Sequence, residues 1–308
     1  MALAPRLVVV HRHTEYEELV ARHGTRQQVG FFLSTRGRTL DEVEARHAAQ
    51  QDALAAAIGA APLEWRRGTV ERMDLARFAF SPDDIVIAVG QDGLVANVAK
   101  YLTGQPVVGI NPEPARYPGV LVQHPPAAAR QMLAVAALMT APAGVPTGGG
   151  RVMVEAELDD GQVIRALNEI YVGHPSHQSA RYRITTATGE GERQSSSGVL
   201  VGTGTGSTGW CRSVWQERGS VLVLPAPADA TACWFVREAW PSPATGTTQV
   251  EGLLQDGETL TIVAESDLVV FGDGIESDRL LLGWGQAVRL RIASQRLMLV
   301  ETDQRLAH

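Results

Sequence analysis

The chain has 308 residues, 44% of them hydrophobic and 20% charged, which is typical of a globular protein with room for two domains. Its formal net charge of -7 excludes a general attraction to nucleic acid or to anionic lipid. Lys100 is the only lysine, so a Walker-type phosphate loop with a Gly-Lys-Ser/Thr triplet is excluded as well. Any phosphate must be held by backbone amides, arginines or a metal ion.

Two features of the sequence predict a cytoplasmic protein that does not cross a membrane. The N-terminus has no charged start followed by an apolar stretch, and no apolar run approaches the roughly 20 residues of a membrane span. Cys211 and Cys233 are the only cysteines, too few for a disulfide scaffold or a zinc site. We interpret them as small core residues in a reducing compartment.

The first 140 residues alternate between strand-like and helix-like patterns. Thr39 and Glu42 fit a capping box at the start of an alanine-rich helix that runs to about residue 58. The expected strands are 7–10, 85–89 and 106–110, and the expected helices are 15–21, 39–58, 95–102 and 126–140. Strands that alternate with helices indicate parallel βαβ units, so residues 1–140 are predicted to form a Rossmann-like α/β domain.

The texture changes after a Pro- and Gly-rich linker at residues 141–150. Short strands then follow closely, interrupted by one helix at about 207–216. The expected strands are 151–158, 163–172, 182–186, 199–202, 260–263, 268–271, 288–292 and 297–300. This spacing predicts a second, largely antiparallel β domain over residues 141–289. Residues 290–308 are expected to complete the first domain.

The first motif is Gly90-Gln-Asp-Gly93, which lies between a buried strand and a helix. Ligands of open α/β sheets lie beyond the carboxyl ends of the strands, and glycines there let a phosphate approach the backbone. Asp92 has two candidate tasks: to accept a proton from an attacking hydroxyl, or to hold Mg²⁺. The alternative is that Asp92 caps the helix and the glycines form the turn.

The second motif is the turn Gly202-Thr-Gly-Thr-Gly-Ser-Thr-Gly-Trp210. The spacing of Gly204, Gly206 and Gly209 satisfies the dinucleotide-binding fingerprint, but no βαβ unit with a suitable acidic residue follows it. Its hydroxyls and amides suit hydrogen bonds to a base and a ribose. A plain glycine-rich turn capped by a hydroxyl is the alternative.

Polar residues inside an apolar strand form the third motif. Asn168 and Glu169 need partners if they are buried, and either cross-strand pairing or ligand contact would supply them. His174 and His177 form a loop pair with no third ligand nearby, so we interpret them as surface histidines and predict no metal ligand from the protein beyond Asp92 as a candidate for Mg²⁺.

Taken in order, these motifs resemble the NAD kinase family, and most closely its mitochondrial-type branch. The matching stretches are Gly90-Gln-Asp-Gly93, Ile110-Asn-Pro-Glu-Pro-Ala-Arg116, Asn168-Glu-Ile-Tyr-Val-Gly173, Ser179-Ala-Arg-Tyr182, Ser196-Ser-Gly198, Thr203-Gly-Thr-Gly-Ser-Thr208 with Trp210, and Phe235-Val-Arg-Glu238. The resemblance as a whole spans roughly residues 84–290. The resemblance implies a kinase that uses ATP and Mg²⁺ to phosphorylate a ribose hydroxyl of NAD or a related nucleotide or nucleoside, and it implies a homodimer.

The resemblance also implies roles for individual residues. Asp92 would be the catalytic acidic residue, and Gly90, Gln91, Gly93 and Asn111 would lie at the phosphates of ATP. The acceptor nucleotide would be held by Asn168, Glu169, Thr203, Thr205, Gly206, Ser207, Thr208 and Trp210.

The chain departs from the family at two positions of the first loop. Gln91 stands where the family has a glycine, and Leu94 replaces a threonine. A side chain at position 91 affects the closest approach of a phosphate, or the φ angle of the loop. A homologue that binds a nucleotide without phosphorylating it is therefore one alternative. An oxidoreductase that uses the glycines of the second motif is the other.

Overall fold

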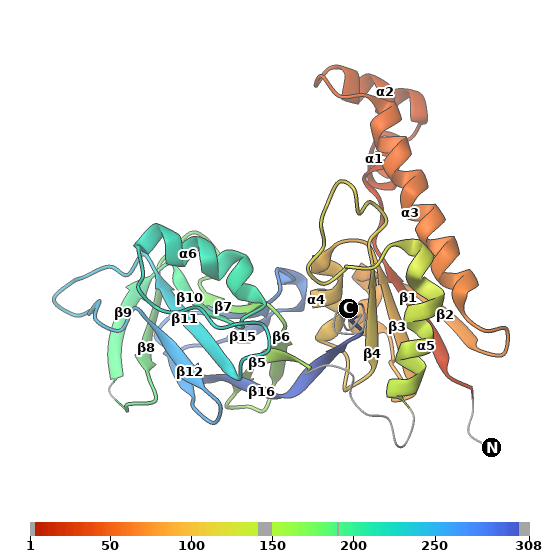
Figure 1. The fold of residues 1–308 in the computed structure, drawn as a ribbon. Coiled ribbons are helices and arrows are strands. Elements are labelled where there is room, and N and C mark those ends of the chain that lie inside the picture. The colour runs from red at the N-terminus through yellow and green to blue at the C-terminus, as the bar shows by residue number, and fades with distance from the viewer. Residues whose placement is uncertain (1–3, 141–149, 190, 302–308) are drawn as a thin grey trace. The chain divides into compact units, whose positions relative to one another are not determined.

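The computed structural model describes residues 4–140, 150–189 and 191–301 (Figure 1). The chain divides into two compact units. Unit 1 comprises Met1–Gly148 and Met298–His308, and unit 2 comprises Gly149–Leu297. The sequence-based division places these boundaries at residues 140 and 290. Of the expected linker, only Gly150 lies within the described residues.

Unit 1 contains a parallel sheet in the order β2-β1-β3-β4. Its strands are β1 (Arg6–His11), β2 (Arg66–Glu71), β3 (Asp84–Val89) and β4 (Pro106–Ile110). Met298 and Leu299, at the end of β16 (Ala287–Leu299), pair in parallel with β4. The chain moves from β1 to β2 on one side and from β3 to β4 on the other, so the strand order reverses between β1 and β3. A reversal of this kind favours a ligand crevice at the carboxyl ends of the two strands.

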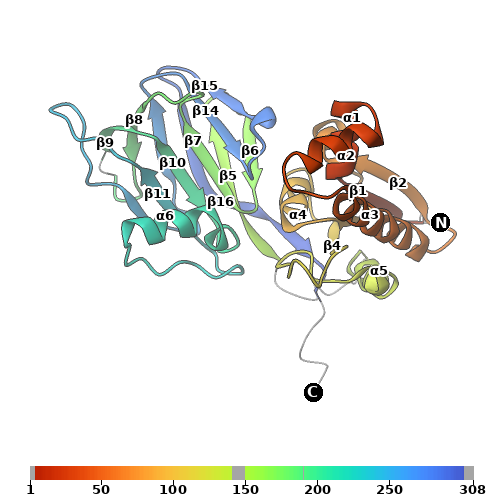
Figure 2. The ribbon, with the colours of Figure 1, turned by 90° about the horizontal axis from the view of Figure 1, so that it is seen from above.

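Unit 1 has helices that bury small side chains against this sheet and helices that pack on one another in a separate apolar cluster. They are α1 (Glu15–His23), α2 (Arg26–Ser34), α3 (Leu40–Ala60), α4 (Asp92–Ala99) and α5 (Ala129–Met139), with short 3₁₀ turns η1 (Arg72–Arg77) and η2 (Pro126–Ala128). Helices α3 and α5 are neighbours in unit 1 (Figure 2). Their alanines share one apolar core with Leu7, Ile85 and Ile110 of the strands. Among the described residues, no helix is long and apolar enough to cross a membrane.

Most of the predicted elements of unit 1 are confirmed. Strand β2 was not predicted, because it is an edge strand whose polar side chains leave only Val70 buried. Helix α2 was missed as well. The Thr39 side chain accepts from the Glu42 amide at 3.4 Å, whereas a fully reciprocal capping box is found at Thr14 and Glu17.

Unit 2 consists of two antiparallel sheets that share one apolar core. The first sheet has the order β12-β11-β10-β7-β14-β15, and the second has the order β6-β5-β16-β13-β8-β9. The bounds are β5 (Arg151–Leu158), β6 (Val163–Ala166), β7 (Glu169–Gly173), β8 (Ala180–Thr185), β9 (Gly191–Ser196), β10 (Gly198–Gly202), β11 (Thr231–Arg237), β12 (Glu251–Gln255), β13 (Leu260–Ala264), β14 (Leu268–Gly272) and β15 (Leu280–Leu282). The predicted largely antiparallel β character of this half is confirmed. The protein is thus a mixed α/β chain, rich in sheet.

The outer face of the first sheet of unit 2 carries a helix, α6 (Trp210–Arg218), which follows a 3₁₀ turn η3 (Gly206–Thr208). Cys211 and Val214 of α6 pack on Leu200 and Phe235 of the sheet. Both cysteines are buried and free. The predicted strand 163–172 is wrong as a single element, because β6 and β7 are separate. The predicted strands 288–292 and 297–300 are one strand, β16, with an irregularity between Ile292 and Arg296.

Candidate functional site

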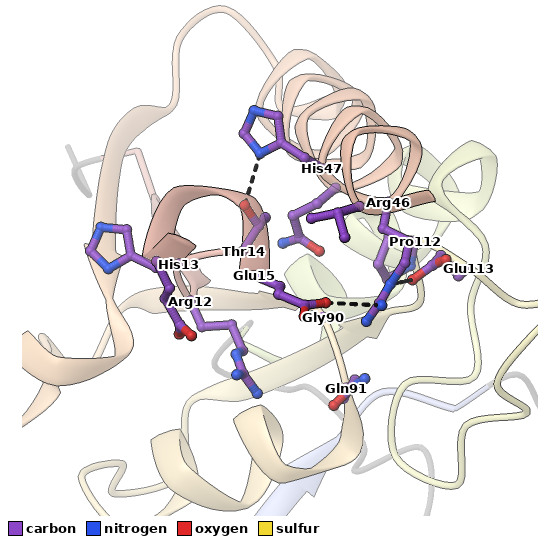
Figure 3. A pocket seen from close by; sticks show the side chains of 13 residues that line it. Arg12, His13, Thr14, Glu15, Arg46, His47, Gly90, Gln91, Pro112 and Glu113 are labelled. Carbon is purple, nitrogen blue, oxygen red and sulfur yellow. Dashed lines mark hydrogen bonds and ion pairs between the residues drawn. The ribbon is translucent and has the colours of Figure 1, made fainter. Parts of the chain in front are cut away.

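Unit 1 has a cavity of about 410 Å³ at the carboxyl ends of its strands (Figure 3). The segments after β1, β3 and β4 line it together with one face of α3. The lining residues are Arg12, His13, Thr14, Glu15, Glu18, Val43, Arg46, His47, Gln50, Gly90, Gln91, Pro112 and Glu113. The cavity therefore lies where the strand order reverses, the place at which open α/β sheets bind ligands.

The turn from β3 to α4 forms one wall of this cavity. Gln50 of α3 donates a hydrogen bond from Nε2 to the carbonyl oxygen of Val89 at 2.9 Å, which fixes the end of β3. Gly90 has a φ angle of 156°, and a residue with a side chain would be strained in this conformation. Gln91 has φ of -105° and ψ of 165°, an ordinary extended conformation. The side chain at position 91 therefore imposes no unfavourable φ on the loop.

Leu94 is a packing residue beneath the turn from β3 to α4. The Leu94 side chain is buried, and its Cδ2 would lie 3.3 Å from a Cβ placed on Gly90. A leucine here therefore supports the turn from beneath but offers no hydroxyl group. Gly93 has no atom within 4 Å of the place where a Cβ would lie, so the space beside the first turn of α4 is open.

The charged groups of the cavity are unevenly paired. The Glu15 carboxylate accepts from Arg38 at 2.5 Å and from Arg46 at 3.2 Å, and the bond from Arg38 is the main reason that the pKa of Glu15 is lowered. Arg46 also lies 3.9 Å from Glu113. Arg12 has no ion pair or hydrogen bond to any described residue, and in Figure 3 its side chain points away from His47. The Arg12 guanidinium is thus available to an anionic ligand.

Asp92 is the first residue of α4, and its carboxylate holds a neighbouring loop. Its Oδ1 accepts from the backbone N–H groups of Leu121 at 2.7 Å and Val122 at 2.9 Å, while Val120 N lies 3.0 Å from Oδ2. Asp92 therefore does not cap its own helix, and the N-cap residue Gln91 makes no side-chain cap bond. Within the described chain, Oδ2 accepts only the Val120 amide, so it retains a lone pair for a hydroxyl group.

Asn111 shapes the same loop from the end of β4. Its Nδ2 donates to the carbonyl oxygen of Tyr117 at 2.6 Å, and its Oδ1 accepts from the amide of Glu113 at 3.0 Å. Asn111 is only 4% exposed, so the loop encloses its side chain. A Cβ on Gly109 would overlap the carbonyl oxygen of Leu121. The Gly-Ile-Asn segment thus serves the close packing of residues 112–124 on β4.

In unit 2, the Asn168-Glu169 pair begins strand β7, where Asp273 holds the backbone. The Asp273 carboxylate accepts from the N–H groups of Leu167 at 2.8 Å and Asn168 at 2.7 Å. Asp273 itself has φ of 53°, a left-handed conformation that aspartate tolerates better than most residues. These hydrogen bonds hold the short connection between β6, which ends at Ala166, and β7, which begins at Glu169.

The side chains of Asn168 and Glu169 have no hydrogen-bond partner in the part of the chain that the structure describes. Burial, and secondly the nearby Asp273 carboxylate, raise the pKa of Glu169 to about 7. A carboxyl group without a partner and with a pKa near neutrality is typical of a functional site. Cross-strand pairing does not account for this residue.

The hydroxyl-rich turn after β10 packs directly against Asn168. Thr203 donates from Oγ1 to the carbonyl oxygen of Leu167 at 2.6 Å, and its backbone N–H donates to the carbonyl oxygen of Asn168 at 2.9 Å. Ser207 donates to the carbonyl oxygen of Thr203 at 3.0 Å, and Thr208 donates to that of Thr205 at 2.9 Å.

Thr205 differs from the other hydroxyls of this turn. Its Oγ1 is buried and has no partner in the structure as described. A buried polar group without a partner costs about 1–3 kcal/mol, and a bound ligand that hydrogen bonds it would recover part of that cost. Glu169 and Thr205 together therefore offer one titratable group and one hydroxyl group for a polar ligand.

The glycines of this turn serve backbone packing and not a dinucleotide fingerprint. A Cβ on Gly206 would overlap the carbonyl oxygen of Asn168, and one on Gly204 would overlap that of Ala226. Strands β10 and β11, which flank the turn and α6, are antiparallel. The fingerprint requires parallel strands in a βαβ unit, so the oxidoreductase alternative loses its structural basis.

The structure thus groups the predicted site residues into two sets. Gly90, Gln91, Gly93, Asp92 and Asn111 surround the turns at the sheet edge of unit 1. The remaining set lies in unit 2, where Asn168 and Glu169 meet the turn 203–208 and Trp210 stacks on Tyr171. Within the described ranges, no three His, Cys, Asp or Glu side chains are arranged to hold a metal ion.

Sequence reasoning missed three charged residues of these sites. Arg12 and Arg46 contribute to the cavity, and Asp273 shapes the start of β7. A signal for Asp273 was present, since Gly272-Asp-Gly274 follows an apolar strand just as Gly90-Gln-Asp-Gly93 does. No comparable signal marks the two arginines, because many arginines of this chain are exposed.

Comparison of the chain with models of known protein families and with curated protein sequences gives no match.

Proposed function

We propose that this protein is a kinase of the NAD kinase type, which transfers a phosphoryl group from ATP to a ribose hydroxyl of NAD or a related adenosine-type nucleotide or nucleoside. The observation that carries the proposal is the cavity at the strand-order reversal of unit 1, into which the Gly90–Gln91 turn and the unpaired Arg12 both project. A guanidinium group and the N-terminal turn of a helix bind phosphate in the absence of a Walker lysine, and the Gly90 amide itself is held by the carbonyl oxygen of Ile110.

The phosphoryl donor is assigned to this cavity. Arg12 would pair with a phosphate oxygen, since no carboxylate of the described chain occupies it. The open space beside Gly93 would let a phosphate approach the N-terminal turn of α4, whose dipole favours anions. Mg²⁺ would arrive with ATP and neutralise charge on the transferred phosphoryl group.

The acceptor is assigned to unit 2. Glu169 would accept or donate a hydrogen bond at the base or ribose, and Thr205 would pair its unsatisfied hydroxyl with a polar atom of the ligand. In the transfer step, the ribose oxygen bonds to the γ-phosphorus as the bond to the β,γ-bridging oxygen breaks, and ADP leaves. Asp92 Oδ2 accepts the hydroxyl proton in this proposal.

A non-catalytic nucleotide-binding homologue is the second candidate. It is favoured by the three backbone N–H groups that the Asp92 carboxylate already holds and by the apolar Leu94 at the place of a hydroxyl residue. In this reading Asp92 only shapes the loop 120–122. The nucleotide would then stabilise the fold without being phosphorylated.

An unbiased acceptor screen separates the two candidates. The purified protein is incubated with Mg-ATP and a panel of nucleotides and nucleosides, and products are identified by mass spectrometry as a gain of one phosphoryl group. A phosphorylated NAD-type product supports the kinase. A rise in melting temperature with nucleotide but no product from any acceptor supports the binding homologue. If the nucleotide causes no rise and no product forms, both candidates are overturned.

A further inference from the structure

A second cavity, of about 430 Å³, lies on the outer face of the first sheet of unit 2, next to the start of α6. Tyr171, Trp210 and Phe271 supply its aromatic wall, and Arg237 and Arg279 supply its cations. Neither arginine has a role in the proposed phosphoryl transfer. The cavity thus combines a flat apolar surface with two arginines, and one carboxylate, Glu276, also lines it.

The aromatic wall is fixed in place by the surrounding backbone. The Tyr171 hydroxyl donates to the carbonyl oxygen of Ser197 at 2.7 Å. Gly173 and Gly198 leave room for its ring, since a Cβ at either position would overlap the ring. The hydrogen bond to Ser197 and the packing on both glycines therefore orient the ring.

Two further rings extend this surface. The Trp210 ring stacks on Tyr171 with centroids 5.6 Å apart and an angle of 20° between the planes. Phe271, which pairs with Tyr171 in the register of β14 and β7, lies 5.1 Å away. A continuous aromatic surface of this kind binds planar rings by stacking, at about 1–3 kcal/mol for a nucleic-acid base.

The two arginines make only long polar contacts with the rest of the fold. Arg237 lies over the Trp210 ring at 5.3 Å, and its carboxylate contact is a single one of 3.4 Å to the adjacent Glu238. Arg279 makes a 3.5 Å bond to the carbonyl oxygen of Glu276. By contrast, Arg193 forms a bidentate ion pair, in which two of its nitrogens donate to the Glu265 carboxylate at 2.8–2.9 Å.

We infer that this cavity is a binding site for a planar aromatic ring that carries a phosphate, which is the chemistry of a mononucleotide. The ring stacks on the part of Trp210 that Tyr171 does not cover, beside the Arg237 guanidinium, and Arg237 and Arg279 hold the phosphate. Binding of a free mononucleotide needs unit 2 alone, whereas the form in which the ligand is half of a dinucleotide rests on the proposed function, because the resemblance assigns Trp210 to the acceptor nucleotide. The ligand has two sources: a free mononucleotide, or one half of a dinucleotide whose other half lies at Glu169, which is on the same face of β7 as Tyr171.

Binding is tested on the full chain without ATP. Adenosine monophosphate is titrated while tryptophan fluorescence is followed, because a ring stacked on Trp210 quenches its emission. Inorganic phosphate and adenosine each supply one half of the chemistry. We expect saturable quenching by the nucleotide, binding at least tenfold weaker for either half, and loss of the quenching in Trp210→Phe. Equal binding of phosphate alone, or no saturable binding by calorimetry, overturns the inference.

Charge-neutral variants test the phosphate contact. Arg237→Gln and Arg279→Gln are each expected to weaken binding by roughly ten- to a hundredfold, because a hydrogen bond to a charged group contributes about 1.5–3 kcal/mol. Arg212→Gln removes the same charge from an exposed position on α6 that does not line the cavity. It is expected to bind like the wild type. An equal loss in Arg212→Gln would attribute binding to general charge and overturn the site.

The two sources are separated by NAD and by Glu169→Gln. If NAD displaces the mononucleotide with at least tenfold higher affinity, and Glu169→Gln weakens only NAD, the cavity holds half of a dinucleotide. If NAD does not compete, the cavity takes a free mononucleotide. Either result supports the site, whereas competition by ribose phosphate as strong as that by the mononucleotide contradicts it.

Discussion

The carboxylate of Asp92 accepts the backbone N–H of Leu121 at 2.7 Å, so the residue assigned to proton transfer also holds a loop. Asp273 has the same relationship with Asn168 in unit 2, at 2.7 Å. Each aspartate follows a strand, precedes a glycine and gathers successive N–H groups from a neighbouring segment. Experiments at Asp92 must therefore separate its role in holding the loop from its proposed role in proton transfer.

Asp92→Asn and Asp92→Ala make this separation. Asparagine keeps one oxygen for Leu121 and Val122 but places an NH₂ group near Val120, so we expect a loss of about 1 kcal/mol in the free energy of unfolding. Alanine leaves two partly enclosed N–H groups without an acceptor, and we expect a loss of about 2–4 kcal/mol. Urea denaturation measures both.

The transfer rate then reports on catalysis. If Asp92 Oδ2 accepts the hydroxyl proton, Asp92→Asn should lose roughly 10²- to 10⁴-fold in rate at a temperature where it is fully folded. A folded Asp92→Asn protein that keeps its rate within about tenfold would restrict Asp92 to shaping the loop.

Gly109→Ala and Gly93→Ala form a matched pair in unit 1. A Cβ at Gly109 would overlap the carbonyl oxygen of Leu121 and lie 2.8 Å from the Cα of Val122. We expect Gly109→Ala to lose more than about 2 kcal/mol of stability because backbone must move. Gly93 lies in α4 with open space around it, and Gly93→Ala should gain about 0.5–1 kcal/mol.

Gly93→Ala also tests the donor assignment. If a phosphate approaches the first turn of α4, the added methyl group should weaken ATP binding while the protein becomes more stable. Calorimetric titration with ATP checks this. Unchanged ATP affinity in the stabilised variant would move the donor away from this turn.

The sequence was sufficient for elements whose apolar pattern is strong. The run at 85–89 is buried on both faces and was correctly predicted as a strand, as was the run at 106–110. Strands β2 and β9 were missed because their side chains are mostly polar and they lie at sheet edges. An edge strand buries little, so its pattern is weak, but the buried central strand β11 was missed as well.

The candidate sites were predictable only in part, for a related reason. Glycine-rich turns after strands pointed to Gly90, Asp92 and the turn at 203–208. The sequence did not indicate that the Asn111 side chain would be enclosed by its own loop, or that Arg12 would lack a partner. The surroundings of Asn111 and of Arg12 both depend on packing between residues far apart in the sequence. The local spacing of residues does not encode this packing.

Arg12→Gln tests the cavity of unit 1 directly. Because Arg12 is exposed and pairs with no described residue, its loss should change the free energy of unfolding by less than about 0.5 kcal/mol. ATP binding should weaken by roughly tenfold or more, since a charge-assisted bond to phosphate is lost. Arg22→Gln, on the exposed side of α1 and outside the cavity, is the control. Equal ATP affinity in the two variants would contradict the assignment.

Glu169 predicts a pH dependence of stability. Burial raises its pKa in the folded protein to about 7, against an ordinary value of 4.5. Between these values the folded state holds a proton that the unfolded chain has released, so stability falls as pH rises, by up to about 1.4 kcal/mol per pH unit. Below pH 4.5 both states are protonated, and above about pH 7 both are ionised, so the dependence is confined to this window.

Glu169→Gln removes the titration and isolates this effect. Relative to the wild type, the variant should be similar in stability near pH 4.5 and increasingly more stable through pH 5 and 6. Above about pH 7.5 this difference in stability should stay constant. Urea denaturation at each pH gives the difference, in which the other titrating groups cancel. Glu217→Gln, which removes an exposed carboxyl from α6, should give a flat difference. A flat difference for Glu169→Gln as well would mean that water reaches the carboxyl group freely, and the hydrogen bond proposed between Glu169 and the acceptor would lose its basis.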